Sequence, residues 1–216
     1  MTLRADLYWS FRSPYSYLAT RRYVALTERY DLEIDLRQVY PLAVRDRTFF
    51  KRNPPNWMRY TMTDVARLAA FYGIPIAPPR PDPIVQDMTT GEVAENQPII
   101  FPLVRMGQAA ARRGKGLAYA DAVSRLIWGG VEGWNEGDHL RQAAASVGLD
   151  HDELAGEVAK DANALDAEID ANRAALEASG HWGVPTLVFN GEPFFGQDRI
   201  ELAEWRMKQS GLEDRA

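Results

Sequence analysis

The segment Leu7-Tyr8-Trp9-Ser10-Phe11-Arg12-Ser13-Pro14-Tyr15-Ser16 marks a change from a strand pattern to a helix pattern near the start of the chain. Leu7, Trp9 and Phe11 alternate with polar or smaller residues, as side chains do in a half-buried strand. Pro14 then opens a helical pattern, and proline is tolerated at the first helical position because its missing N–H has no partner there. The segment therefore predicts a strand that gives way to a helix at this proline.

A second strand is predicted over residues 31–40, where Leu32, Ile34, Leu36 and Gln38 fall on one face. The intervening residues are long enough for a helix that joins two parallel strands by a right-handed crossover. The chain therefore starts with a strand, a helix and a second strand.

The middle of the chain is predicted to be almost wholly helical. Residues 73–83 are the exception, since five prolines there disfavour helix and predict an extended connector that wraps the surface or borders a site. We expect helices at 63–72, 102–113, 119–129, 138–147 and 150–178. The basic run at 111–115 is interpreted as a solvated helix end.

A strand–turn–strand–helix pattern ends the chain. Residues 186–190 are rich in β-forming types, Asn190-Gly191 favours a hairpin turn, and 193–195 can form the return strand. We expect Gln197 or Asp198 to cap a last helix. The complete order resembles the thioredoxin arrangement with a helical insertion.

These elements predict an α/β, thioredoxin-like fold with an inserted all-helical domain. The discontinuous thioredoxin-like domain is predicted to comprise residues 1–45 and 179–216, and the helical domain residues 46–178. Of the 216 residues, 46% are hydrophobic and 25% charged, which predicts a packed core.

The charge and the start of the chain exclude two classes of partner. A net charge of -5 argues against nucleic acid, because phosphate binding needs clustered Lys and Arg. The chain enters its first strand directly, and no apolar run reaches the ~18 residues of a membrane span. We expect no membrane association and a cytoplasmic location.

Cysteine is absent from the chain, which removes disulfides, thiolate metal ligands and a cysteine nucleophile. No spacing of His, Asp and Glu suggests a metal site. His139, His151 and His181 form no recognisable catalytic triad, and we expect His139 and His151 on helix surfaces.

The strand–helix junction carries serines where thioredoxin-like redox proteins carry Cys-x-x-Cys, at a helix terminus whose positive end stabilises a thiolate. Here Ser13 and Ser16 occupy both positions. A purely structural interpretation makes Ser13 a helix N-cap and turns Ser16 outward.

A second motif, His181-Trp182-Gly183-Val184-Pro185-Thr186, precedes the third strand. Its proline either marks a strand edge or forms a cis bond with Val184. In a thioredoxin-like fold, a cis bond sets the Val184 backbone beside Ser13, where it can pair with an extended peptide such as glutathione.

A third motif is Phe194-Phe195-Gly196-Gln197-Asp198-Arg199. Asp198 either caps the last helix or accepts hydrogen bonds from a ligand α-amino group. In the second interpretation, the N–H groups of Gly196 and Gln197 receive the ligand carboxylate.

Together the three motifs resemble those of 2-hydroxychromene-2-carboxylate isomerase and kappa-class glutathione transferase, over essentially the whole chain. The resemblance implies glutathione as cofactor, with Ser13 as the catalytic residue that holds its sulfur. It further implies a homodimer and a small aromatic substrate. The glutathione-binding residues that it implies are Ser13, Val184, Phe195, Gly196, Gln197 and Asp198.

Asn53-Pro54-Pro55 resembles a family segment whose asparagine lies near the substrate, which implies substrate binding by Asn53 and Pro54; an ordinary loop is the alternative. The lysine that often follows this segment in the family is replaced by Arg59 nearby, which offers a planar fork and not a point charge.

The function that this resemblance implies is a glutathione-dependent isomerisation of 2-hydroxychromene-2-carboxylate or a related aromatic catabolite. Ser13 is expected to stabilise the glutathione thiolate, since no His–Asp pair activates it as a nucleophile. Two alternatives stay open: a kappa-class-like glutathione S-transferase, and a non-catalytic, cysteine-free DsbA-like module that binds peptides.

Overall fold

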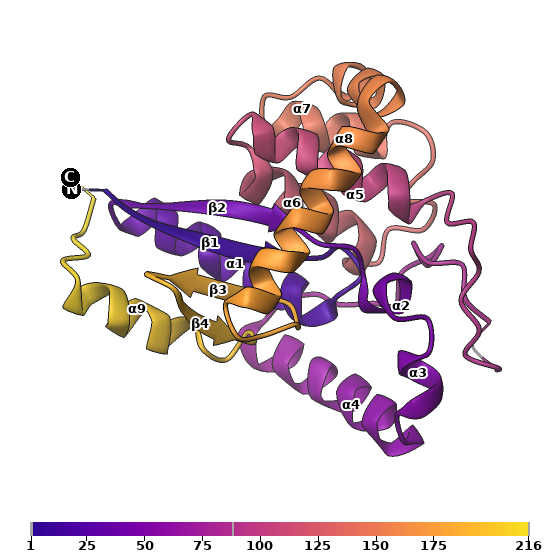
Figure 1. Ribbon diagram of the computed structural model, residues 1–216, viewed down its shortest axis with the longest axis horizontal. Helices are drawn as coiled ribbons and strands as arrows, with labels where there is room; N and C mark the ends of the chain where they lie inside the picture. Colours follow the sequence, from indigo (N-terminus) through magenta and orange to yellow (C-terminus); the bar gives the residue numbers. More distant parts are fainter. Residues whose placement is uncertain (1, 88, 216) are drawn as a thin grey trace.

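A four-stranded mixed sheet runs through the protein, whose computed structural model describes residues 2–87 and 89–215 (Figure 1). The strand order is β2-β1-β3-β4. β1 and β2 are parallel, and the other neighbouring pairs are antiparallel. This confirms both the predicted parallel pair and the terminal hairpin. The strands are β1 (Leu3–Trp9), β2 (Leu32–Gln38), β3 (Thr186–Phe189) and β4 (Glu192–Phe195).

Both faces of β1 are covered. Leu7 and Trp9 are fully buried in the main core, whereas Tyr8 packs on the opposite face with Leu176. This division follows from the alternation of side chains along a strand. The long helix that supplies Leu176 therefore covers the second face of the sheet.

Two helices belong to the strand framework. α1 (Pro14–Arg29) connects β1 to β2, and α9 (Ile200–Gln209) follows β4 and packs against α1. The remaining helices lie between β2 and β3 in the sequence and surround the carboxyl end of β1 (Figure 1). They are α2 (Leu42–Arg45), α3 (Phe49–Arg52), α4 (Pro55–Tyr72), α5 (Ile100–Arg112), α6 (Gly116–Trp128), α7 (His139–Ser146) and α8 (His151–Ala178).

The five predicted helices of this block are present, with one large difference in extent. α4 begins at Pro55, not near Thr63. Its first turns carry mostly exposed side chains, so they lack the apolar repeat by which the sequence identifies a helix. α2 and α3 are single turns that have no such repeat at all.

The basic run at 111–115 ends α5 and is largely exposed, as predicted, but its two arginines also form ion pairs that the sequence did not indicate. Arg112 forms ion pairs with three carboxylates of α8, and Arg113 with one of them. These pairs tie α5 to α8, and sequence alone could not show that an acidic helix face lies opposite. The carboxylates belong to Glu157, Asp161 and Glu168.

The proline-rich connector at 73–83 lies against the strand–helix junction. The hydroxyl of Tyr17 donates to the carbonyl oxygen of Pro75 at 2.6 Å. The guanidinium of Arg12 binds both carboxylate oxygens of Asp82, at 2.6 and 2.5 Å. The connector therefore borders the residues around Ser13, one of the two arrangements expected.

The predicted cap of the last helix is wrong. The N-cap position of α9 is Arg199, and no side chain caps it. The Asp198 carboxylate instead pairs with the adjacent Arg199 guanidinium at 2.6 Å. The Gln197 side chain is buried and accepts from Arg22 at 3.3 Å. The side chains of Gln197 and Asp198 therefore bond to arginines and do not cap α9.

Candidate functional site

Ser13 lies at the N-terminus of α1, where its hydroxyl oxygen accepts a hydrogen bond from the Ser16 N–H at 3.1 Å. The same hydroxyl donates to the carbonyl oxygen of Val184 at 3.3 Å. Ser13 therefore caps the helix, as the structural interpretation requires, and also contacts the segment predicted to bind a peptide. The two interpretations describe compatible properties of one side chain.

Ser16 does not face outward, and that prediction is wrong. The residue is fully buried, and its hydroxyl has no hydrogen-bond partner in the part of the chain that the structure describes. Trp9 lies next to it, since its indole N–H donates to the Ser16 carbonyl oxygen at 3.2 Å. The first turn of α1 thus presents this position to the core.

The Val184–Pro185 bond is cis, as predicted. Among residues 2–87 and 89–215, the Val184 N–H has no acceptor. A backbone donor without a partner beside Ser13 is what an extended peptide ligand needs in order to pair with this segment.

The structure changes the predicted role of Gly196. Its N–H donates to the carbonyl oxygen of Pro185 at 2.9 Å, so this group is not available to a ligand carboxylate. Its φ of +103° favours glycine, and a Cβ here would lie 2.7 Å from the Asp198 carboxylate. The Gln197 N–H has no acceptor among the described residues and is the remaining backbone donor.

Arg22 of α1 supports this loop and was not identified from the sequence. Its guanidinium donates to the Gln197 carbonyl oxygen at 2.5 Å and stacks over the Tyr72 ring at 4.3 Å. Asp198 is exposed and pairs only with Arg199 in the described structure. A ligand ammonium group could therefore reach the Asp198 carboxylate in competition with that arginine.

A row of aromatic rings extends from β4 past the Val184 segment, and the sequence analysis missed it. His181 stacks on Phe195 with a centroid distance of 3.9 Å and on Trp182 at 5.6 Å. Phe49 lies 5.9 Å from Trp182 and 5.2 Å from Trp57. We call these five residues the aromatic row. Trp182 and Phe195 are half-exposed, so the row offers an apolar aromatic surface to solvent.

His181 is held in its neutral form within the row. Burial lowers the pKa of its imidazole below 6.5. Its Nδ1 accepts a hydrogen bond from the Gly183 N–H at 2.9 Å, which requires that nitrogen to be unprotonated. A Cβ on Gly183 would lie 2.6 Å from the Phe195 ring, so only glycine fits behind the stack.

Asn53 and Pro54 adjoin the row at its far end. The Asn53 side-chain amide donates to the Phe49 carbonyl oxygen at 2.7 Å, and its own N–H is bonded to the same oxygen. Asn53 thus closes α3, as the loop interpretation expects, and Pro54 is exposed. Within the described structure neither residue is hydrogen bonded to Ser13. Arg59 is exposed and bonds to Asn56.

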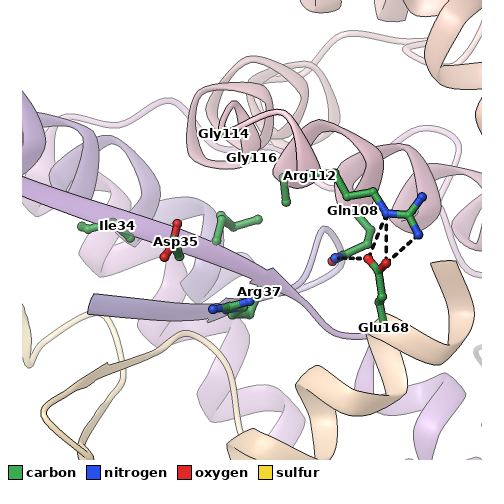
Figure 2. A pocket seen from close by; sticks show the side chains of 10 residues that line it. Ile34, Asp35, Arg37, Gln108, Arg112, Gly114, Gly116 and Glu168 are labelled. Carbon is green, nitrogen blue, oxygen red and sulfur yellow. Dashed lines mark hydrogen bonds and ion pairs between the residues drawn. The ribbon is translucent and has the colours of Figure 1, made fainter. Parts of the chain in front are cut away.

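A pocket beside the edge strand β2 lies away from all predicted site residues. Figure 2 shows Gln108 and Arg112 converging on Glu168. Both oxygens of that carboxylate accept from Arg112, and Gln108 donates to one of them at 2.8 Å. These polar groups are already paired with one another, so the pocket links α5 to α8 and offers little to a ligand.

The described residues provide neither a metal site nor a membrane-spanning helix. Across residues 2–87 and 89–215, no group of three or more His, Asp or Glu side chains could hold a metal ion. None of the helices in those residues is long and apolar enough to cross a membrane. Ser13 contacts Val184, the N–H of Gly196 bonds to Pro185, and Phe195 belongs to the aromatic row, so these segments form the candidate site.

Comparison with known families agrees with this fold. A family model described as DSBA-like thioredoxin domain matches residues 4–208. The chain belongs to this family. It has the α/β thioredoxin-like DsbA fold with Ser13 and Ser16 at the start of α1, and its sequence contains no cysteine thiol for disulfide chemistry.

Two curated relatives of this DsbA-like protein have a named activity. One is a 2-hydroxychromene-2-carboxylate isomerase of Pseudomonas putida, 29% identical over 207 residues, covering 94% of this chain and 93% of the relative. The other is an enzyme of the same name from Sphingobium xenophagum, 28% identical over 212 residues, covering 94% and 97%. The chain is similar to these isomerases over nearly its full length.

Solved structures share the fold. A 2-hydroxychromene-2-carboxylate isomerase superposes with a TM-score of 0.72 at 23% identity, covering 96% of this chain and 95% of the other. A probable DsbA oxidoreductase from Streptomyces coelicolor gives 0.66 at 19% identity, covering 96% and 89%. At these identities the likeness concerns the fold alone.

Proposed function

We propose that this protein is a glutathione-dependent isomerase of 2-hydroxychromene-2-carboxylate or a related aromatic catabolite. The observation that carries the proposal is the contact of the Ser13 hydroxyl, at the start of α1, with the Val184 carbonyl oxygen. A hydroxyl at a helix N-terminus suits a bound thiolate, and the chain has no thiol of its own. The similarity to isomerases over 94% of the chain supports the same activity.

Ser13 stabilises negative charge on sulfur in this proposal. Glutathione held beside Ser13 and Val184 would supply a thiolate for reversible addition to a conjugated carbon of the substrate, which would allow the former double bond to rotate before the thiolate is released. The 3.3 Å bond from Ser13 to Val184 is long, so the hydroxyl can turn toward a sulfur at small cost. The positive end of the 16-residue helix α1 adds to this stabilisation.

Other residues of the chain bind the rest of the ligands. The N–H groups of Val184 and Gln197 serve the peptide backbone and the γ-glutamyl carboxylate, and Asp198 accepts from the α-amino group. The aromatic substrate lies on the aromatic row, with Phe195 at one end and Asn53 and Pro54 near the other. We also propose that the protein is a cytoplasmic homodimer, with residues 46–178 as its inserted helical domain.

Calorimetry with reduced glutathione is the direct test. We expect glutathione to bind saturably. S-methylglutathione should bind with lower affinity, because the methyl group removes the negative charge that Ser13 stabilises. Isomerisation of 2-hydroxychromene-2-carboxylate, followed by absorbance, is expected only when glutathione is present. Absence of glutathione binding to the folded protein would leave the peptide-binding alternative, and a stable conjugate with an electrophile would indicate the transferase.

A further inference from the structure

Arg45, the last residue of α2, is a partly buried cation without a carboxylate partner. Its Nε donates to the Tyr40 carbonyl oxygen at 2.8 Å and its Nη1 to the Trp182 carbonyl oxygen at 3.1 Å. A guanidinium has five N–H donors, so these two bonds leave others unused. In the described part of the chain, the other lysines and arginines without an ion pair are exposed: Lys51, Arg59, Arg67, Lys115, Lys160 and Arg215.

The surroundings of Arg45 do not neutralise it. The charged groups that face it are Arg173 and Glu177 of α8, which pair with each other at 3.0 Å. Burial lowers the pKa of Arg45, the positive charge of Arg173 lowers it further, and the negative charge of Glu177 opposes both effects. The group nevertheless stays charged at neutral pH, since arginine is not deprotonated in proteins. A net positive charge therefore remains at this point, where an anion would be stabilised.

The neighbouring charged residues are already paired. Asp46 accepts from Thr48 at 2.8 Å and forms an ion pair with Arg52. Arg47 pairs with Glu95 at 3.0 Å and donates to the Val93 carbonyl oxygen. Arg45 is thus set apart by its lack of an anionic partner and by its contact with the loop that carries Trp182.

The position of Arg45 relates it to the aromatic row. It bonds to the backbone of Trp182, whose half-exposed ring lies between those of His181 and Phe49. Trp182 is itself two residues before Val184. An apolar aromatic surface with a cation near it matches a ligand that places an aromatic ring or a peptide on this surface and carries a carboxylate at its end.

We propose that Arg45 binds the carboxylate of a ligand on the aromatic row. This inference rests on the proposed function for the identity of the ligand, and two carboxylates fit the chemistry. One belongs to the aromatic substrate and the other to the glycine end of glutathione. Arg45 then determines which small molecules are accepted, whereas Ser13 acts on the sulfur.

The experiment measures binding by calorimetry to wild type, Arg45→Gln, Arg45→Lys and the control Arg47→Gln. Chromone-2-carboxylate and chromone form one probe pair, and glutathione and its analogue with an amide in place of the glycine carboxylate form the other; within each pair, the second compound lacks the carboxylate in question. We expect Arg45→Gln to weaken binding of one carboxylate probe by about 10- to 100-fold, as loss of a charged hydrogen bond does, and to leave its partner unchanged. The pair in which only the carboxylate-bearing probe binds Arg45→Gln more weakly identifies the carboxylate that Arg45 binds.

Arg45→Lys keeps the charge without the planar fork, so we expect a smaller loss. Arg47→Gln should bind like wild type. Thermal unfolding of each variant checks that it is folded. If Arg45→Gln does not fold, the comparison is made with Arg45→Lys. Equal effects on both members of each pair, or no effect of either Arg45 substitution, would overturn the inference. If wild type fails to bind glutathione but chromone-2-carboxylate still requires Arg45, only the proposed function fails.

Discussion

The hydroxyl of Ser13 and the carbonyl oxygen of Val184 are hydrogen bonded at 3.3 Å, although the two residues are 171 positions apart in the sequence. The bond joins the start of α1 to the segment before β3. Because Ser13 also accepts from the Ser16 N–H, one side chain serves both the helix and this contact. Stability and ligand chemistry at Ser13 are therefore coupled and must be measured together.

Ser13→Ala is predicted to lower stability and turnover by different mechanisms. Loss of the N-cap should reduce the free energy of unfolding by about 1 kcal/mol. Loss of a preorganised donor to a thiolate should reduce glutathione-dependent turnover by roughly 100-fold. Urea unfolding and turnover measured on the same preparation separate the two effects. A less stable variant with full activity would contradict the catalytic role.

Ser16→Ala is the matched substitution at the other former cysteine position. The buried Ser16 hydroxyl has no partner in the described structure, so its removal relieves a desolvation cost. We expect stability that is equal to or above that of wild type, with turnover retained. Thermal unfolding compared with Ser13→Ala checks this, and a loss of stability as large as that of Ser13→Ala would show that the hydroxyl has a partner after all.

Gly183→Ala is predicted to disrupt the aromatic row. The new Cβ would lie 2.6 Å from the Phe195 ring and 2.9 Å from His181, so the stack must move. We expect a loss of about 1–3 kcal/mol in the free energy of unfolding, typical of overpacking. Gly156→Ala in α8 is the control, because no atom lies within 4 Å of its Cβ. There alanine should stabilise the helix by about 0.5–1 kcal/mol.

The order of strands and helices could be predicted because it depends on local patterns. The alternation around Leu7 and the proline at the start of α1 are visible in any short window of sequence. The contact of Ser13 with Val184 followed from the resemblance, since the fold brings these two loops together. It needed no knowledge of side-chain packing.

Other features depend on which surfaces meet, and the sequence could not supply them. Ser16 is buried because the first turn of α1 faces Trp9, and a short polar motif does not show its orientation. The Gly196 N–H is occupied because of a backbone bond to Pro185. The aromatic row combines three segments far apart in the chain, so no single motif indicated it.

His181 is predicted to make stability depend on pH in mildly acidic solution. Burial lowers the pKa of its imidazole below the 6.5 of an unfolded chain, so the unfolded state binds more protons as pH falls through 6.5. The contribution of His181 is therefore complete above pH 6.5 and declines below it, until the pKa of the folded state is passed. Protonation also breaks the bond from the Gly183 N–H to Nδ1.

His181→Phe tests this directly, because phenylalanine keeps a flat ring against Phe195 but cannot be protonated. The free energy of urea unfolding is measured for both proteins from pH 5 to pH 8. Below pH 6.5 we expect the free energy of unfolding of the wild type to fall relative to that of the variant. Above pH 6.5 we expect the difference between the two proteins to be constant. A difference that is independent of pH over the whole range would show that His181 has the same pKa in both states.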